Sequence, residues 1–274
     1  MIPVAFDYKR ASSADEAISL LAEYGDEAKL LAGGHSLLPL MKLRLAAPSV
    51  LIDVGRLTDL SYVRDAGDHV AIGALTRHRD VEISDLLRAQ QPLLAAAAAE
   101  VGDNQVRHRG TIGGSVAHAD PASDLPATLL ALDATFVAKG PNGERAIPAA
   151  QFFTGFLESA LQPDELLTEI RVPKSPGSGF GFQKFNRRAQ DWAIVGCAVT
   201  RSASGTGIAL VNMGSTPLRA TAVEQALAGG ASIADAAQLA DQGTEPSADL
   251  NASAEYRRHL ARVLVRRALE TAGA

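Results

Sequence analysis

Cysteine is nearly absent from this chain of 274 residues, in which Cys197 is the only one. The chain therefore forms no internal disulfide, and it cannot supply the four thiolates that hold an iron–sulfur cluster. Cys197 itself lies in the apolar run 193–199, which predicts a buried strand with the thiol in the core. The six histidines show no metal-ligand spacing, and His108 and His118 lack clustered carboxylate or thiol partners, so the sequence predicts no metal site.

Excess positive charge and long apolar runs are also absent. Lys and Arg number 26 against 31 Asp and Glu, and this net charge of −5 gives no electrostatic reason to expect nucleic-acid binding. The most apolar run, residues 92–99, ends at Glu100, far short of a membrane span. The N-terminus lacks a basic region followed by an apolar core, which is the pattern of a signal peptide. We therefore expect a cytoplasmic protein, either free or peripherally bound at the inner face of the membrane.

Motifs for catalysis by side chains are missing as well. No local pattern indicates a nucleophilic triad or a carboxylate pair, so the sequence predicts no catalytic residue and argues against a hydrolase. The length is sufficient for two or three subdomains with a substantial core. The composition, 47% hydrophobic and 21% charged, is that of an ordinary globular protein.

The chain does contain a distinctive first glycine segment, residues 30–43. A short apolar run predicts a strand that ends at Gly33 and Gly34. Ser36 is then placed to cap a helix, and Pro39 falls in its first turn, where the missing N–H does no harm. Such a turn aims unpaired main-chain N–H groups at one point and suits an anion such as a pyrophosphate. A plain connection is the alternative, since neither a G-x-G-x-x-G motif nor a P-loop is present.

A second glycine segment, residues 111–126, repeats the pattern. Gly113 and Gly114 are flanked by hydroxyl residues and precede a predicted helix. We place the start of this helix at Ser123, because a start at residue 120 would leave Pro126 in the helix interior. Two such segments in one chain predict two walls of a single elongated site for an anionic ligand.

The remaining pattern predicts alternating strands and helices. Strand 50–54 completes a β-α-β opening with parallel strands, and residues 62–73 read as a hairpin turning at 65–68. The linker 174–179 marks a domain boundary. The other predicted helices cover residues 13–24, 79–87, 92–101, 123–132 and 254–270, and the other predicted strands cover residues 135–138, 167–172, 181–186, 193–200 and 208–213.

The last predicted helix carries an arginine run. Its apolar positions, Tyr256, Leu260, Val263 and Leu264, are predicted to share one face. The arginines lie elsewhere on the helix and are interpreted as a solvated face, with contact to a partner subunit as the alternative. They are Arg257, Arg258, Arg262, Arg266 and Arg267.

The two glycine segments, with residues 32–39 and 111–114 at their centres, resemble the FAD-binding (medium) subunit of molybdenum hydroxylases. The nearest likeness is to the medium subunit of aerobic carbon monoxide dehydrogenase, and the same flavin module occurs in xanthine dehydrogenases. The resemblance runs from Phe6 to the C-terminal helix and includes residues 212–219. It is specific for the family and uninformative about the substrate.

The resemblance implies an α+β protein with a two-subdomain FAD-binding fold of the vanillyl-alcohol oxidase type. A small β-α-β N-terminal part (1–54) and a larger mixed α/β middle part (55–176) would together hold the flavin. A C-terminal domain (177–274) would consist of a three-stranded antiparallel sheet with helices.

The function implied is that of an FAD-carrying electron-transfer subunit. A large molybdopterin partner would oxidise the substrate, and a small iron–sulfur partner would pass electrons to the FAD in a dimer of heterotrimers. The final acceptor would be a quinone, NAD or oxygen. Two alternatives stay open: a stand-alone flavin reductase or oxidase acting on a small molecule, and a scaffold subunit without flavin.

The resemblance also carries FAD contacts onto residues of this chain. The two glycine segments supply most of them, and the rest are isolated positions. The cofactor-binding residues implied are Lys29, Leu31, Ala32, Gly33, Gly34, His35, Ser36, Leu37, Val101, Thr111, Gly113, Gly114, Ser115, Ala119, Asp124, Leu166, Lys184 and Trp192.

Three of these positions have specific roles. Asp124 would accept hydrogen bonds from ribose or ribityl hydroxyls, because a carboxylate is repelled by a pyrophosphate; otherwise it is a favourable acid in the first turn of a helix. Leu166 and Lys184 would line the adenine and flavin regions, with Lys184 on the strand face opposite the aromatic residues of 182–185, unless it is merely solvated. Trp192 stands where carbon monoxide dehydrogenase has a tyrosine beside the flavin ring, so we expect it to cover or gate that ring; a core tryptophan is the alternative.

Overall fold

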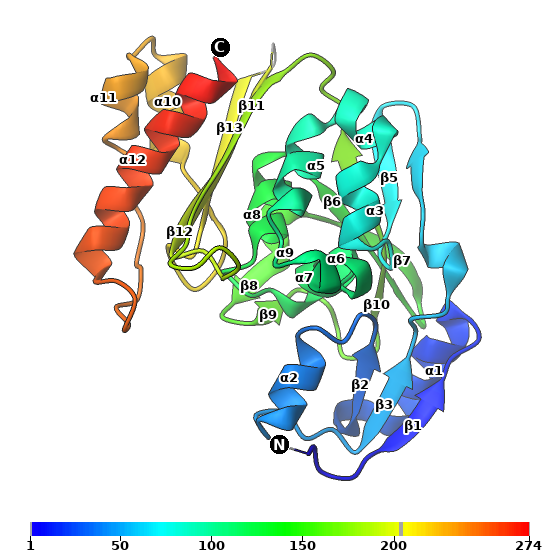
Figure 1. Ribbon diagram of the computed structural model, residues 1–274. Coiled ribbons are helices and arrows are strands. Elements are labelled where there is room, and N and C mark those ends of the chain that lie inside the picture. The colour runs from blue at the N-terminus through cyan, green and yellow to red at the C-terminus, as the bar shows by residue number, and fades with distance from the viewer. Residues whose placement is uncertain (1, 203–204, 274) are drawn as a thin grey trace.

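The computed structural model describes residues 2–202 and 205–273, which form three sheet-containing parts along the chain (Figure 1). The N-terminal part is a parallel sheet of β1 (Asp7–Arg10), β2 (Ala28–Leu31) and β3 (Val50–Asp53) in the order β1-β3-β2. Helix α1 (Ala14–Tyr24) packs Ile18 and Leu21 against it. Ser13 caps α1 and Gly25, at φ +53°, ends it. The predicted parallel β-α-β opening is therefore confirmed.

The middle part is an antiparallel sheet with its helices on one face (Figure 1). The strand order β4-β5-β10-β6-β7 comprises β4 (Val63–Asp65), β5 (His69–Gly73), β10 (Leu166–Pro173), β6 (Thr135–Gly140) and β7 (Gly143–Pro148). The covering elements are α3 (His78–Ile83), α4 (Asp85–Gln90), α5 (Pro92–Ala99), α6 (Asn104–Arg109), α7 (Ile112–His118), α8 (Asp124–Ala131), α9 (Ala149–Phe152) and the small hairpin β8 (Phe153–Gly155) with β9 (Glu158–Ser159). Short 3₁₀ turns lie at Gly25–Glu27 and Thr58–Leu60.

One predicted helix of the middle part is divided. The run 79–87 forms the end of α3 and the start of α4, because Ser84 adopts an extended backbone and its hydroxyl accepts the N–H of Leu87 as the cap of α4. The predicted hairpin at 65–68 and the strands β6 and β10 are confirmed. Strands β7, β8 and β9 were not predicted.

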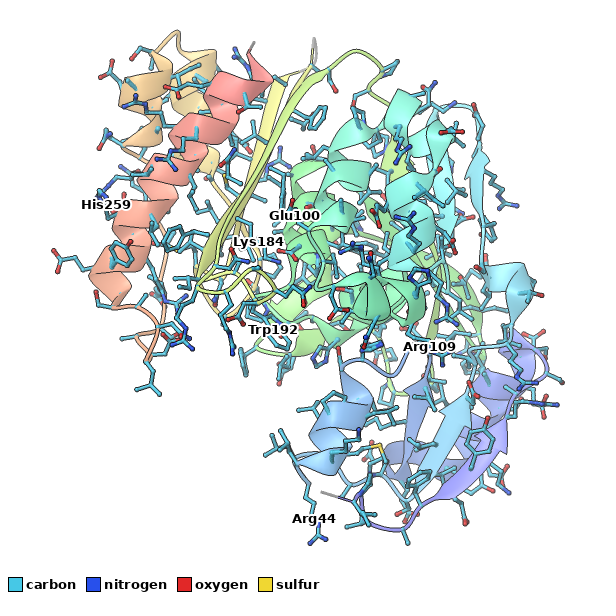
Figure 2. The ribbon with its side chains drawn as sticks, in the orientation of Figure 1. Arg44, Glu100, Arg109, Lys184, Trp192 and His259 are labelled. Atoms are coloured by element: carbon cyan, nitrogen blue, oxygen red, sulfur yellow. The ribbon has the colours of Figure 1, made fainter. Side chains whose placement is uncertain are left out.

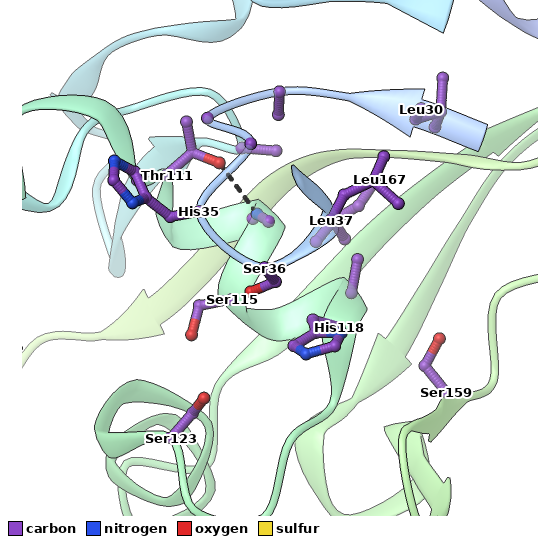
Figure 3. Close-up of a pocket in the computed structure, with 18 of the residues that line it drawn as sticks. Leu30, His35, Ser36, Leu37, Thr111, Ser115, His118, Ser123, Ser159 and Leu167 are labelled. Atoms are coloured by element: carbon purple, nitrogen blue, oxygen red, sulfur yellow. Dashed lines mark hydrogen bonds between the residues drawn. The ribbon is translucent and has the colours of Figure 1, made fainter. Parts of the chain in front are cut away.

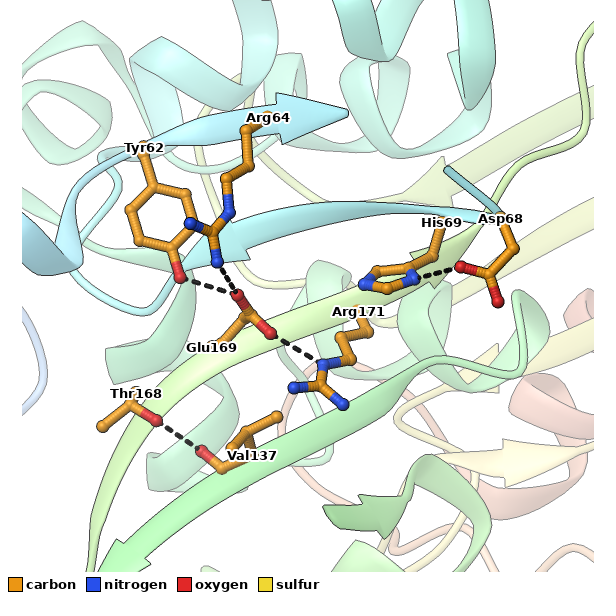
Figure 4. Close-up of polar contacts among 8 residues, drawn as sticks. All are labelled: Tyr62, Arg64, Asp68, His69, Val137, Thr168, Glu169 and Arg171. Atoms are coloured by element: carbon orange, nitrogen blue, oxygen red, sulfur yellow. Dashed lines mark hydrogen bonds and ion pairs between the residues drawn. The ribbon is translucent and has the colours of Figure 1, made fainter. Parts of the chain in front are cut away.

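A buried carboxylate organises the sheet face that points away from the helices (Figure 4). Glu169 of β10 accepts hydrogen bonds from Tyr62 Oη at 2.7 Å, Arg64 Nη2 at 2.9 Å and Arg171 Nε at 2.7 Å. Burial, together with the adjacent Glu169 carboxylate, raises the pKa of Tyr62 to about 12, so this phenol stays protonated as a donor. The hydrogen bonds of Tyr62 and Arg64 with Glu169 thus connect the β4 segment to β10, with β5 lying between the two strands.

The C-terminal part is an antiparallel sheet covered on both faces. Its order is β11 (Gly179–Phe185), β12 (Val195–Ser202), β13 (Gly205–Val211) and β14 (Leu218–Arg219), so a two-residue fourth strand extends the three that were predicted. Helices α10 (Thr221–Ala228), α11 (Ile233–Ala237) and α12 (Ala254–Ala272) cover the outer face, and α5 and α8 of the middle part cover the inner face (Figure 1). The domain boundaries at 54/55 and 176/177 stay a prediction.

Helix α12 differs from its predicted pattern at Tyr256 and at one arginine. Leu260 and Leu264 face the sheet as predicted, whereas Tyr256 is 44% exposed. Arg257 is only 1% exposed, so its interpretation as part of a solvated face is wrong. Its Cα lies on the same stripe as Leu260 and Leu264. Its guanidinium donates to the carbonyl of Ile194 and pairs with the partly exposed carboxylate of Asp249.

Cys197 is confirmed as a core residue of β12, with no exposed surface. Burial raises the pKa of its thiol to about 12, so almost no thiolate forms in the native protein. We therefore expect the native chain to resist labelling by a disulfide reagent at pH 8 and the urea-unfolded chain to take up one label. Rapid labelling without denaturant would contradict this packing.

Candidate functional site

All three parts of the fold contribute to one large cavity, with a volume of about 1010 Å³ (Figure 3). Its walls come from the loop between β2 and α2 (Leu37–Lys42), the start of α7, the start of β10 and the loop between β11 and β12. The size is that of a cofactor cleft rather than of a packing void. The two glycine segments thus line the same cavity, as the sequence predicts.

The first glycine segment approaches the second very closely. A Cβ built on Gly33 would lie 2.3 Å from the carbonyl oxygen of Arg109 and 2.8 Å from the Cα of Gly110, so only glycine fits there. Gly34 has φ +77°, the left-handed region that favours glycine, as expected for such a turn. The strand, the turn and the helix α2 with Pro39 in its first turn are all confirmed.

Several main-chain donors of this turn are unpartnered. Among residues 2–202 and 205–273, no acceptor pairs with the N–H groups of Gly33, Gly34, His35 or Ser36. Ser36 precedes α2, but its hydroxyl makes no capping hydrogen bond, so that group is also available to a ligand. The turn therefore presents a row of donors without intramolecular acceptors, which suits an anion.

The second glycine segment is built differently from its prediction. Gly113 and Gly114 lie inside helix α7, capped by Thr111, and do not form a turn before a later helix. Their N–H groups already donate to the Ala74 carbonyl at 2.9 Å and to Thr111 Oγ1 at 3.1 Å, and that of Ser115 donates to the Thr111 carbonyl at 3.0 Å. The expectation that these amides are free donors is therefore wrong. The wall offers the hydroxyls of Thr111 and Ser115 instead (Figure 3).

Packing explains why this wall requires glycine. A Cβ on Gly113 would meet Ala74 at 2.5 Å, and one on Gly114 would meet Thr111 Oγ1 at 2.7 Å. Small residues let α7 lie directly on the chain that leaves β5. The predicted helix start at Ser123 is confirmed, with α8 beginning at Asp124.

A buried ion pair closes one side of the cavity. Lys184 Nζ lies 2.8 Å from Asp124 Oδ2 and donates to the carbonyl of Glu100 at 2.9 Å (Figure 2). The two side chains are 5% and 7% exposed, so the alternative of a solvated lysine is wrong. Residues two apart on a strand point the same way, so Lys184 shares its strand face with Phe182. The prediction that Lys184 lies opposite the aromatic residues is therefore wrong for Phe182.

The other carboxylate oxygen of this pair is unsatisfied. Asp124 Oδ1 is buried and has no hydrogen-bond partner among the described residues. Burial raises the pKa of Asp124 to about 6, against the opposing effect of Lys184. A lone buried acceptor beside a large cavity indicates a ligand donor such as a hydroxyl.

The raised pKa of Asp124 predicts a pH dependence of stability. A carboxyl whose folded pKa lies above its ordinary 3.8 stabilises the fold at low pH and loses that contribution as the pH rises through about 6. His78 acts in the opposite direction, because burial lowers its pKa to about 4 and favours the fold as the pH rises. Because His78 is present in both proteins, its contribution cancels when the wild type is compared with Asp124→Asn.

We expect the free energy of unfolding of the wild type, relative to Asp124→Asn, to fall by a few kcal/mol between pH 4 and pH 6 and to level off above pH 6. Urea unfolding of both proteins at half-unit pH steps measures it. A difference that is independent of pH would show that Asp124 titrates normally.

Trp192 lies on the cavity wall and is 66% exposed, so the core-tryptophan alternative is wrong (Figure 2). It belongs to the loop between β11 and β12. A second, smaller cavity of about 100 Å³ also touches Trp192.

Of the residues that the sequence predicts for the site, all but two line the large cavity. Ala119 is fully buried at the left-handed C-terminus of α7, and Leu31 lies behind the cavity wall against Gly34. The lining residues are Lys29, Ala32, Gly33, Gly34, His35, Ser36, Leu37, Val101, Thr111, Gly113, Gly114, Ser115, Asp124, Leu166, Lys184 and Trp192.

Several lining residues were not predicted. His118 lies one helical turn after Ser115 on α7, and this spacing could have identified it (Figure 3). His78 and Gln162 come from segments without a sequence signal, and the fold alone brings them to the cavity. Other additions with polar side chains include Ser123, Ser159, Arg188, Gln190 and Asp191.

Metal-binding clusters and membrane-spanning helices are both absent from the described ranges. No three His, Cys, Asp or Glu side chains within residues 2–202 and 205–273 are arranged to hold a metal ion. In the same ranges, no helix is both long and apolar enough to cross a membrane.

Comparison with known proteins gives consistent matches over the whole chain. Residues 4–175 match the family described as FAD binding domain in molybdopterin dehydrogenase, and residues 180–272 match the CO dehydrogenase flavoprotein C-terminal domain. The chain is 44% identical to the carbon monoxide dehydrogenase medium chain of Hydrogenophaga pseudoflava, covering 100% of this chain and 99% of that one. It is 42% identical to the 6-hydroxypseudooxynicotine dehydrogenase complex subunit alpha of Paenarthrobacter nicotinovorans, covering 99% and 96%.

A solved structure agrees with these sequence matches. Carbon monoxide dehydrogenase from Hydrogenophaga pseudoflava superposes with a TM-score of 0.96 at 46% identity, covering 100% of this chain and 99% of that chain. The α+β architecture expected from the resemblance is thereby confirmed.

Proposed function

The chain belongs to the FAD-binding medium subunits of carbon monoxide dehydrogenase-type molybdopterin dehydrogenases, and on this premise we propose how its cavity holds FAD and which partners it serves. As a member of this family it is a subunit of a heteromeric oxidoreductase. When bound, FAD supplies the electron-carrying chemistry, and the protein supplies position and electrostatics.

The residues of the cavity fit FAD. The unpartnered amides of residues 33–36 form a row of donors suited to a diphosphate, and this row is the observation that carries the proposal. The hydroxyls of Thr111 and Ser115 would bind the same group from the opposite wall. Gly33 permits the close contact between the two walls on which this arrangement depends.

The remaining contacts follow from the chemistry of each side chain. Asp124 Oδ1, buried and unpartnered, would accept a hydrogen bond from a ribose or ribityl hydroxyl. Lys184 holds Asp124 in place and keeps a positive charge beside the cavity. Leu166 would line the adenine region, and Trp192 would cover the isoalloxazine ring at the mouth.

The assembly proposed for the chain has two partners. A large partner would hold the molybdopterin at which the substrate is oxidised, and a small partner would hold the iron–sulfur clusters, since a chain with one cysteine cannot ligate them. We place the chain in a dimer of such heterotrimers that passes electrons to a quinone, NAD or oxygen. A cytoplasmic location, free or peripherally bound, stays a prediction.

Gel filtration of the native complex, with flavin absorption recorded along the profile, tests this function. We expect one FAD per chain and co-elution with two further polypeptides. A lone flavin-bearing species of monomer or dimer size that oxidises a small molecule would favour the stand-alone enzyme. A complex without flavin would leave only a scaffold role.

A further inference from the structure

The loop between β11 and β12, residues 186–194, is closed at its base by the N–H of Ile194, which donates to the carbonyl of Phe185 at 2.7 Å. Between these ends it has few contacts of its own. Arg188 Nε contacts Asp191 Oδ2 at 2.9 Å, and Asp191 Oδ1 accepts the N–H of Trp192 at 3.0 Å. Arg188 is 68% exposed, so water weakens this ion pair. We call this segment the Trp192 loop, because it carries Trp192 to the mouth of the large cavity.

Two side chains from elsewhere in the C-terminal part hold the end of the Trp192 loop. Asn212 Nδ2 donates to the carbonyl of Ala193 at 2.7 Å, and Arg257 Nη1 donates to the carbonyl of Ile194. Both acceptors directly follow Trp192 in the chain. Their positions therefore set the direction in which Trp192 leaves the sheet.

Both terminal nitrogens of the Arg257 guanidinium are hydrogen-bonded, which restricts the side chain to one orientation. It is 1% exposed, and its other arm, Nη2, contacts Asp249 Oδ2 at 2.8 Å. Asp249 is itself held by the N–H groups of Asn251 and Ala252 at 2.8 and 3.0 Å. A planar guanidinium can donate to Ile194 and Asp249 at once, which a lysine ammonium on a flexible stem cannot reproduce.

Asn212 joins the Trp192 loop to another wall of the cavity. Its main-chain N–H donates to the carbonyl of Pro121 at 2.8 Å, in the segment that leads to Ser123 and Asp124. Its backbone has φ +61°, an unfavourable conformation for most side chains that asparagine tolerates. The strained residue persists because its amide and main chain are both engaged.

The space behind the loop is partly empty. The small cavity of about 100 Å³ is lined by Trp192, Ala193, Ile194, Asn212 and Arg257, among others. Ala193 and Ile194 are themselves packed in the core, at 2% and 7% exposed, so the cavity leaves only the Trp192 side of the loop without close packing.

We propose that Arg257 and Asn212 are positioning residues that fix Trp192 at the mouth of the FAD cavity and link helix α12 to that mouth. The inference rests on the proposed function, because it assumes that Trp192 covers the flavin. The arrangement would place the ring of Trp192 in one orientation over bound FAD, while neither Arg257 nor Asn212 contacts the cofactor.

Because Trp192 is the only tryptophan, its fluorescence reports on this loop alone. The proteins compared are the FAD-loaded wild type, Arg257→Lys, Arg257→Gln and Asn212→Gly. Arg266→Gln on the exposed face of α12 is the control, since Arg266 is 57% exposed and pairs with Glu270 at the surface. We expect all variants to keep their FAD content. The flavin-dependent quenching of Trp192 fluorescence should decrease from the wild type to Arg257→Lys and further to Arg257→Gln. The Arg266→Gln control should match the wild type.

A second readout separates this inference from the proposed function. The fast component of Trp192 anisotropy decay, which reports nanosecond motion, should grow in the same order even in flavin-free protein. Unchanged anisotropy and quenching in correctly folded Arg257→Lys and Asn212→Gly would overturn the inference. If the Arg257 variants fail to fold, the anisotropy and quenching of Asn212→Gly test the inference alone. This variant is expected to fold, because glycine adopts the positive φ of position 212 without strain. A wild type that never binds FAD would overturn the proposed function and leave the anisotropy test valid.

Discussion

Gly33→Ala is expected to purify with about tenfold less FAD than the wild type, because the added methyl must push the two walls of the cavity apart. Its Cβ would lie 2.3 Å from the main-chain oxygen of Arg109, and neither backbone can yield without displacing the unpartnered amides. Overlap of this kind costs about 1–3 kcal/mol, and about 1.4 kcal/mol already corresponds to a tenfold change in binding. Flavin absorption per chain after gel filtration measures the effect.

Gly207→Ala is the matched control for this variant. Its Cβ would lie 2.2 Å from the main-chain oxygen of Ala131, which is a similar overlap at the packing of β13 on α8. We expect Gly207→Ala to lose a comparable amount of stability while keeping its FAD. Equal flavin content in Gly33→Ala and the wild type would show that FAD binding does not depend on the close contact between the walls.

Lys184→Met is expected to lower the free energy of unfolding by about 3–5 kcal/mol at pH 8, where Asp124 is ionised. The substitution leaves a carboxylate that is 7% exposed without its cation, inside the packing of the middle part on the C-terminal sheet. The loss should shrink at pH 5, because Asp124 is then largely protonated. Urea unfolding at both pH values measures the change.

Two further variants show whether the missing partner is the cause. Asp124→Leu combined with Lys184→Met removes both charges and should recover most of the loss. Lys139→Met breaks the ion pair of Lys139 with Asp15, whose side chain is 77% exposed, and should cost only about 0–1 kcal/mol. A double variant as unstable as Lys184→Met would attribute the loss to lysine packing instead of charge.

Local signals in the sequence predicted much of the fold. Ser13 and Gly25 delimit α1, and Ser123 starts α8, because capping is determined by a few neighbouring residues. The position of Gly34 in a turn with positive φ is likewise a local property. Of the positions carried over from the resemblance, all but Leu31 and Ala119 line the cavity.

Long-range contacts could not be predicted in this way. The sequence places Lys184 and Asp124 60 positions apart, and only the packing of the C-terminal sheet on α5 and α8 brings them together. Arg257 can be buried because Ile194 and Asp249 supply acceptors for its guanidinium. These acceptors lie outside α12, so the pattern of residues along the helix does not reveal them. Gly113 and Gly114 appeared to form a turn, because the contact of α7 with Ala74 is visible only in three dimensions.

The central claim is that the free amides of residues 33–36 bind the diphosphate of FAD across a cavity closed by α7. A crystal structure of the FAD-bound chain tests it most directly. We expect diphosphate oxygens within hydrogen-bonding distance of these amides, with the hydroxyl of Thr111 or Ser115 on the other side. A diphosphate held elsewhere, with the amides of residues 33–36 still unpartnered, would contradict it.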